Sequence, residues 1–159
     1  MIIAVAGHET TANLLGAAMI RLLDPEGPSL ATVDDQMITE LLRLDSPVQA
    51  VGRTAICDHV LDDVTIRAGE PALVVIAAAN RDPAVFDPPG EFQPARSGPP
   101  PLAFGYGAHY CLGAALARLE LAAALRRVLA RRPVLGGHPT WRDTPAIRGP
   151  LTLPVVFGG

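Results

Sequence analysis

Cys111 stands where this sequence is best equipped for chemistry, within residues 104–113, which read FGYGAHYCLG. Gly105 and Gly107 precede it, and glycines let the backbone turn tightly and let a bulky group approach closely. Residues 114–130 follow it, rich in Ala, Leu and Arg and free of Pro and Gly, which predicts a long helix. Cys111 is therefore expected at a helix N-terminus, where free backbone N–H groups and the helix dipole favour a negatively charged sulfur.

The residues alone leave three interpretations of this cysteine. It could be an ordinary buried thiol, the usual fate of a free cysteine, or a nucleophile paired with His109. It could also be the soft ligand of a flat cofactor, because Gly113 removes a side chain from the first turn of the helix, where such a cofactor would lie.

Residues 104–113 resemble the haem-binding loop of the cytochromes P450, Phe-Gly-x-Gly-x-His-x-Cys-x-Gly, and match all six of its defined positions. This agreement favours haem binding over the other two interpretations. The resemblance implies that Cys111 is the axial thiolate ligand of the iron of haem b, a ligand that favours O–O cleavage. It also implies a set of cofactor-binding residues in this loop: Phe104, Gly105, His109, Cys111 and Gly113.

Residues 1–23 predict a helix whose beginning is missing, because no capping residue precedes its apolar run. Inside it lies the segment AGHETT. Gly and Thr are weak helix formers, although Thr or Glu near a helix start is also common as a cap. The segment resembles the oxygen-activation segment of the P450 family. By that resemblance Ala6 and Gly7 leave room for dioxygen, while Glu9 and Thr10 form the acid–alcohol pair that delivers protons in a site closed to water.

A second helix is predicted over residues 33–44, where Glu40 and Arg43 can pair on one face. Alone, such a pair contributes little. It follows the AGHETT segment and precedes the cysteine segment, in the order the P450 family uses, and resembles the Glu-x-x-Arg motif of that family, with Arg96 in FQPAR as third partner. The resemblance implies a structural ion-pair network that anchors the haem loop. A further helix usual in the family has little room here, and residues 29–32 are at most a remnant of it.

Short β-branched stretches at residues 53–56, 64–66 and 72–77, separated by turn residues, predict a small sheet. In the family, the strand after Glu-x-x-Arg carries an arginine to a haem propionate, and Arg53 fits that role beside His109. The end of the chain resembles the family's C-terminal hairpin. The resemblance implies five substrate contacts: Val48, Ala50, Val51, Ala146 and Ile147.

The composition, 159 residues with 49% apolar side chains and a formal net charge of −3, predicts one globular domain and no nucleic-acid binding. Cys57 and Cys111 are far apart with no CxxC, so neither zinc nor a disulfide framework is indicated. The apolar first residues are too few to span a membrane and lack a basic leader, which predicts a soluble, cytoplasmic protein. Some of the arginines between residues 118 and 132 are expected to steer an acidic electron donor, although cations near a helix C-terminus are also favourable in themselves.

Together the motifs predict a mainly α-helical fold with small β-sheets (α+β). It is the C-terminal part of the P450 fold, from the end of the oxygen-activation helix to the helix after the Cys loop. Residues 1–159 are expected to form a single incomplete haem-binding region.

The implied function is that of a haem-thiolate monooxygenase, present as a fragment. It inserts one atom of dioxygen into an unidentified organic molecule with electrons from a ferredoxin-type partner, and involves neither nucleic acid nor membrane. Two alternatives stay open: a non-catalytic haem-binding remnant, and a structural or interaction protein without haem. The isolated chain is expected to be poorly active, because the absent part of the family's fold closes the substrate pocket.

Overall fold

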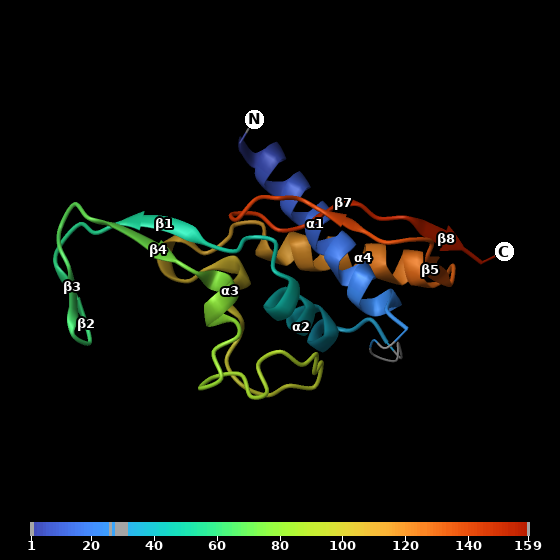
Figure 1. The fold of residues 1–159 in the computed structure, drawn as a ribbon, viewed down its shortest axis with the longest axis horizontal. Coiled ribbons are helices and arrows are strands. Elements are labelled where there is room, and N and C mark those ends of the chain that lie inside the picture. Colours follow the sequence, from blue (N-terminus) through green and yellow to red (C-terminus); the bar gives the residue numbers. More distant parts are fainter. Residues whose placement is uncertain (1, 26, 28–31, 159) are drawn as a thin grey trace.

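Three packed helices form the core of the protein. The computed structural model describes residues 2–25, 27 and 32–158. Of the expected remnant at residues 29–32, only Thr32 is among them, and it is not helical. Figure 1 shows the first long helix crossing the last, with the second helix beside them. The helices are α1 (Ile2–Leu23), α2 (Asp35–Asp45), the short α3 (Ile76–Ala79) and α4 (Ala114–Leu129).

Apolar side chains at helical spacing explain why α1, α2 and α4 pack together. In α2 they form one stripe, while Asp34 caps the helix by accepting a hydrogen bond of 2.8 Å from the N–H of Met37. Burying these stripes is the main source of stability available to this fold. The buried cluster consists of Leu14, Ala18, Met19, Leu22, Met37, Ile38, Leu41, Leu42, Leu121, Ala122 and Leu125.

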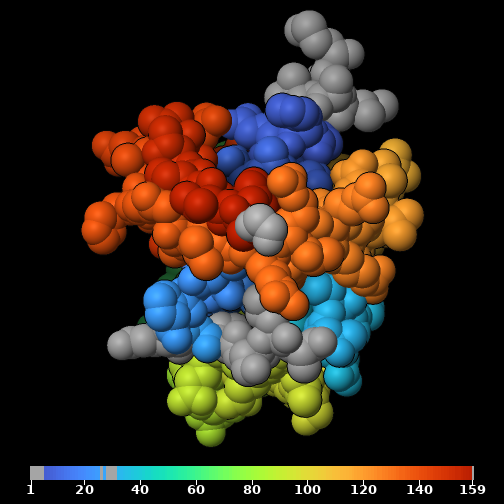
Figure 2. Space-filling view, turned by 90° about the vertical axis from the view of Figure 1, so that its right-hand side faces the viewer, coloured from blue at the N-terminus to red at the C-terminus, as the bar shows by residue number. Residues whose placement is uncertain are grey.

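In the residues that the structure describes, the strands form four separate two-stranded antiparallel ladders, which pair β1 with β4, β2 with β3, β5 with β8 and β6 with β7. The first two ladders follow one another and extend away from the helices (Figure 1). The other two belong to the C-terminal residues, which Figure 2 shows in red against α1 in blue. The strands are β1 (Val51–Thr54), β2 (His59–Leu61), β3 (Val64–Ile66), β4 (Pro71–Val74), β5 (Pro133–Leu135), β6 (Thr140–Trp141), β7 (Pro150–Thr152) and β8 (Val155–Phe157).

The predicted elements are present, with corrected boundaries. The helix expected over residues 33–44 begins at Asp35, because Asp34 takes the cap position. The strand expected over residues 72–77 ends at Val74, because α3 begins at Ile76. The single sheet expected here is instead two ladders, since β2 folds back on β3 and not on β1.

Residues 80–101 connect α3 to the cysteine segment through turns and bends. Two turns of 3₁₀ helix follow, η1 (Leu102–Phe104) and η2 (Gly107–His109), and α4 begins shortly after them. Because the connection lacks a strand or helix, its backbone carbonyls need hydrogen-bond donors from elsewhere. The source of those donors shapes the functional site.

Candidate functional site

The Cys loop, residues 102–113, turns twice before α4 begins. Its backbone takes a φ of 75° at Gly105 and of 76° at Gly107, angles that residues other than glycine rarely adopt. The turns bring the N–H of Cys111 to the carbonyl of Phe104, 2.9 Å away. The side chain of Cys111 is exposed. The tight turns predicted at both glycines are therefore present, and they present the thiol outward.

Glycine keeps the space beside this thiol clear. A Cβ on Gly107 would meet nothing within 4 Å, and a Cβ on Gly113 would lie 4.0 Å from Cys111 Sγ. Gly113 also holds the N-cap position of α4, where glycine has no side chain to bond the first N–H groups. A flat group can therefore approach the sulfur and the start of α4 without meeting a side chain from these positions.

The buried Asn80 at the end of α3 ties the Cys loop to the core. Its Oδ1 accepts a hydrogen bond of 2.7 Å from the N–H of Leu102, the first residue of η1. Its backbone carbonyl accepts one of 2.9 Å from Arg43 Nη1. Sequence reasoning missed Asn80, although a polar residue that closes an apolar run before a turn cluster was an available signal.

Glu40 and Arg43 form a bidentate ion pair inside the core. Only 3% of Glu40 and 1% of Arg43 are exposed. Arg43 Nε donates to Glu40 Oε2 at 2.8 Å, and Arg43 Nη2 donates to Oε1 at 2.7 Å. Parallel bonds of this kind are the strongest that a guanidinium and a carboxylate make. The pair is thus a core feature, not the solvated helix-surface pair that the spacing alone also allowed.

Arg96 joins the same network. Its Nε lies 3.3 Å from Glu40 Oε1, and the N–H of Gln93 donates to that oxygen at 3.0 Å. The terminal guanidinium nitrogens of Arg43 and Arg96 also donate to backbone carbonyls of the irregular segment, namely those of Asp87, Pro88, Pro89 and Glu91. The arginines therefore supply the donors that this segment lacks. They connect α2 to the chain that leads into the Cys loop.

Charge and burial compete at Glu40. Burial by itself raises the pKa of Glu40, but the hydrogen bonds from Arg43, Gln93 and Arg96 outweigh it and hold the pKa below its usual value. Glu40 is therefore a carboxylate at neutral pH, as its role between two guanidinium groups requires.

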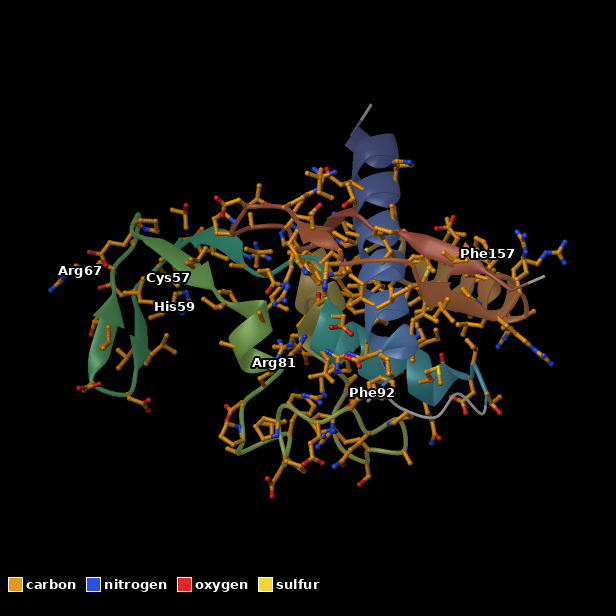
Figure 3. The ribbon with its side chains drawn as sticks, turned by 45° about the vertical axis from the view of Figure 1, so that its right-hand side comes forward. Cys57, His59, Arg67, Arg81, Phe92 and Phe157 are labelled. Carbon is orange, nitrogen blue, oxygen red and sulfur yellow. The ribbon has the colours of Figure 1, made fainter. Side chains whose placement is uncertain are left out.

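Two further arginines bind the last turn of α2. Arg21 of α1 binds Asp45 with Nε at 2.5 Å from Oδ2 and Nη2 at 2.8 Å from Oδ1, and these hydrogen bonds raise the pKa of Arg21. Arg81 lies between the end of α3 and α2 (Figure 3) and donates to the carbonyl of Leu44. Burial lowers the pKa of Arg81. The last turn of the helix that carries the Glu40 pair is thus held by α1 and by the residues after α3.

Arg53 of β1 and His109 of η2 are far apart in sequence but line one open depression of about 480 Å³, together with Gly52 and Thr54. Arg53 Nη1 also donates to the carbonyl of Gly52 at 2.8 Å. A guanidinium and an imidazole beside open space suit a ligand that carries carboxylates. The fold therefore brings together the two residues that the sequence paired as propionate partners.

α1 stays a continuous helix through its polar segment. Thr10 Oγ1 donates to the carbonyl of Ala6 at 2.7 Å, and Thr11 Oγ1 donates to that of Gly7 at 2.8 Å. These hydroxyls bond back one turn within the helix, so they do not cap its start, and the capping interpretation is wrong. A Cβ on Gly7 would meet nothing within 4 Å, which leaves that face of the helix open.

Glu9 pairs with a residue that sequence reasoning did not single out. Its Oε1 lies 3.2 Å from Nη1 of Arg142, which directly follows β6. Glu9 and Thr10, which the resemblance paired as acid and alcohol, therefore have separate partners, Arg142 and the carbonyl of Ala6.

The segments expected to contact substrate meet one another. The N–H of Gln49 donates to the carbonyl of Ala146 at 2.9 Å, and Val48 forms an antiparallel bridge with Ile147. Ala50 and Val51 continue from this point into β1. The five residues thus lie on two backbone segments that are hydrogen-bonded to each other.

α4 uses two of its arginines to hold α2. Arg118 Nη2 lies 3.0 Å from Asp35 Oδ1, and Arg126 Nη2 donates to the carbonyl of Val33 at 2.8 Å. The guanidinium of Arg131 lies 4.3 Å from the ring centroid of Phe157. The cations of α4 are therefore only partly available to a partner protein.

The other cysteine lies elsewhere. Cys57 is exposed in the bend between β1 and β2, with Sγ 3.7 Å from His59 Nε2 (Figure 3). Among the described residues, no group of three or more His, Cys, Asp or Glu side chains is placed to hold a metal ion. Nor does the described part of the chain contain a helix long and apolar enough to cross a membrane.

Comparison with known proteins identifies the family. A family model described as Cytochrome P450 matches residues 32–134, which include the Glu40 network and the whole Cys loop. The chain belongs to the cytochrome P450 family.

Curated P450 relatives match almost the whole chain. The putative cytochrome P450 140 of Mycobacterium tuberculosis is 46% identical over 167 residues, which cover 99% of this chain and 38% of that protein. The biotin biosynthesis cytochrome P450 of Bacillus subtilis is 40% identical, over 99% of this chain and 42% of that protein. The chain therefore spans about two fifths of the length of these relatives.

Solved P450 structures share the fold. P450BioI, in complex with an acyl carrier protein ligated to hexadec-9Z-enoic acid, has a TM-score of 0.87 and 38% identity and covers 99% of this chain and 43% of its own. The tirandamycin C-bound P450 monooxygenase TamI has a TM-score of 0.87 and 35% identity, with 99% and 43% coverage. The prediction of part of a P450 fold is confirmed.

P450 proteins bind haem, and the residues of this chain fit that cofactor. The exposed Cys111 offers a soft ligand beside space that glycines keep clear. Two residues earlier in the loop, His109 lines the depression that Arg53 shares. Two carboxylate-binding groups thus line one open depression, and an exposed thiol follows two residues after one of them.

Proposed function

We propose that this P450 chain is the haem-binding part of a monooxygenase that inserts one atom of dioxygen into an organic small molecule. The observation that carries the proposal is the placement of Arg53 and His109 on one depression, two residues from the exposed Cys111. A relative supports it: the cytochrome P450 monooxygenase PikC of Streptomyces venezuelae is 41% identical over 97% of this chain.

Each loop residue has a role that suits its chemistry. Cys111 would hold the iron of haem b through its sulfur, and Arg53 and His109 would bind the two propionates. Gly105 and Gly113 place no side chain against a bound ring. When bound, haem with a thiolate ligand supplies the activation of dioxygen and the cleavage of its O–O bond.

The polar segment of α1 supplies protons. The Thr10 hydroxyl gives its hydrogen to the carbonyl of Ala6, which leaves its oxygen free to accept from water or another donor. Glu9 is a carboxyl group one residue away, able to take up and release a proton. Ala6 has only a methyl side chain and Gly7 has none, which leaves room for dioxygen at the helix surface.

We assign the substrate to the connected stretch formed by residues 48–51 and the turn at residues 146–147. The electrons come from a ferredoxin-type donor. Arg127 near the end of α4 and Arg132 just after the helix are exposed cations that suit an acidic partner. A structural protein without haem is not favoured, because the family match and the residue types of the loop both support a haem protein.

The test is an absorption spectrum of the purified chain after haem reconstitution, reduction and exposure to carbon monoxide. A strongly red-shifted Soret band is expected from a thiolate-ligated iron. Cys111→Ser is expected to abolish that band, whereas the matched variant Cys57→Ser, in the bend between β1 and β2, retains it. A red-shifted band that survives in Cys111→Ser would contradict the assignment of the ligand.

A separate measurement addresses turnover by the 159-residue chain alone. We expect substrate-dependent oxygen insertion to be slow, since the chain spans about two fifths of the length of its relatives. Turnover at an ordinary enzymatic rate, on the order of 1–10³ s⁻¹, would show that the chain needs no further part.

A further inference from the structure

The C-terminal hairpin consists of β6, β7 and residues 142–149 between them. It packs against α1 at two points where only glycine fits. A Cβ on Gly149 would lie 2.3 Å from Asn13 Cγ, and a Cβ on Gly16 would lie 2.5 Å from Pro150 Cγ. Contacts this close cannot slide along the helix without a clash. The hairpin therefore has one fixed register on α1.

A hydrogen bond within the hairpin fixes the position of Arg142 relative to the glycine that packs on α1. The N–H of Arg142 donates to the carbonyl of Gly149 at 3.2 Å, so Arg142 lies directly across from the glycine that packs on Asn13. Asn13 is about one helical turn after Glu9. The Arg142 side chain reaches back over that turn and places Nη1 3.2 Å from Glu9 Oε1. Backbone contacts thus position both partners of the ion pair.

The same loop is also held from the other side. The N–H of Arg148 donates to the carbonyl of Pro47 at 2.7 Å, and the carbonyl of Ala146 accepts from Gln49 at 2.9 Å. Within the turn, Thr144 Oγ1 donates to the carbonyl of Ile147 at 2.7 Å. Residues 142–149 are therefore one braced unit, with the ion pair at its start and the proposed substrate contacts near its end.

We propose that Arg142 is a positioning residue, which holds the carboxylate of Glu9 against the C-terminal hairpin and so links the substrate-facing turn to proton delivery. The inference rests on the proposed function, in which Glu9 delivers protons. Arg142 acts through Glu9 and touches neither substrate nor cofactor. Because 36% of the Glu9 side chain and 41% of the Arg142 side chain are exposed, the pair contributes little to folding, and its effect falls on the orientation of Glu9.

The test uses the haem-loaded full chain and needs no natural substrate or electron donor. The probe is the oxidation of guaiacol driven by hydrogen peroxide, which still requires proton transfer during O–O cleavage. We expect Glu9→Gln to lower the rate at least tenfold and Arg142→Gln at least threefold. Arg142→Lys, which keeps the charge, restores at least half of the rate, and the double variant Glu9→Gln/Arg142→Gln is no slower than Glu9→Gln alone.

Arg148→Gln is the matched control, since its guanidinium lies in the same loop but stacks on Trp141 at 4.8 Å. It is expected to keep the wild-type rate. If Glu9→Gln slows the reaction and Arg142→Gln does not, the inference fails and the proposed function stands. If Glu9→Gln has no effect, proton delivery by Glu9 fails, and the inference fails with it.

A second readout works without haem. Amide hydrogen exchange in residues 7–12 is expected to quicken at least twofold in Arg142→Gln and to stay at the wild-type rate in Arg148→Gln. Equal exchange in Arg142→Gln and the wild type would overturn the inference that Arg142 holds Glu9 against the hairpin.

Discussion

Glu40 is the residue on which the segment before the Cys loop depends most. Its two oxygens bind Arg43 and Arg96, and those arginines hold four backbone carbonyls of the irregular chain. Removing the carboxylate charge would leave buried guanidinium groups without a counter-ion. We expect Glu40→Gln to lower the free energy of unfolding by about 3–5 kcal/mol at neutral pH. Urea denaturation measures the change.

This prediction has a definite pH dependence. The pKa of folded Glu40 lies below its usual value of 4.5, so the carboxylate stabilises the folded chain above that pH. The stabilisation is lost as the pH falls below 4.5 and through the folded pKa. The stability difference between the wild type and Glu40→Gln should therefore shrink under acid conditions, and a constant difference would contradict the account.

Asp35→Asn is the matched control for this residue. Asp35 pairs with Arg118 at the surface, where 83% of the Asp35 side chain is exposed. Exposed pairs contribute roughly 0–1 kcal/mol, so the urea midpoint is expected to move little. Two ion pairs from the same helix are thus expected to differ in effect, because Glu40 is buried and binds two arginines, whereas Asp35 is exposed and pairs with one.

At the scale of elements, the close packing of the C-terminal hairpin on α1 fixes the polar segment of α1 relative to that hairpin. Gly149→Ala places a Cβ 2.3 Å from Asn13, and this overpacking is expected to lower the free energy of unfolding by about 1–3 kcal/mol. Gly90→Ala is the matched control, because a Cβ there meets nothing within 4 Å. Identical urea midpoints for the two variants would show that the hairpin moves freely on α1.

α4 connects chemistry to stability in one element. Its first turn follows Cys111, its buried face contributes Leu121 and Leu125 to the core, and Arg118 and Arg126 bind the start of α2. A long helix is stiff, so packing at its middle fixes the position of the loop at its start. This is why the glycine-containing Cys loop can hold the Cys111 thiol in a defined place.

At the scale of the whole molecule, the first two ladders carry apolar side chains into solvent. In the described part of the chain each of these strands pairs with a single partner, which leaves outer edges open. The exposed side chains include Ile56 at 93%, Val60 at 72% and Leu73 at 68%. Patches of this kind promote association.

We therefore expect the isolated chain to self-associate, with a mass that rises with concentration in analytical ultracentrifugation. The double variant Ile56→Lys/Val60→Lys should weaken the association at least threefold. Val134→Lys, which adds charge at an exposed apolar position on β5, is the control and should leave it in place. A chain that stays monomeric at all concentrations would contradict the prediction.

The sequence by itself determined the local features of this protein. Helical spacing placed α1, α2 and α4 to within a few residues, and paired glycines marked the turns of the Cys loop. The Glu-x-x-Arg and cysteine motifs, and their order along the chain, also indicated the P450 family. Each motif lies within a few consecutive residues and can therefore be recognised without the fold. Boundaries were less well determined, because a cap such as Asp34 or a turn before α3 depends on single hydrogen bonds.

Only the tertiary structure decided what meets across the chain. It brought Arg53 to His109, buried Glu40, placed Asn80 on Leu102 and set Arg142 beside Glu9. Most partners in these networks are backbone carbonyls or residues distant in sequence. Every residue carries a carbonyl, so no residue type marks the one that will accept a hydrogen bond. Long-range pairing follows from how the helices pack, which the spacing of residues within one element does not encode.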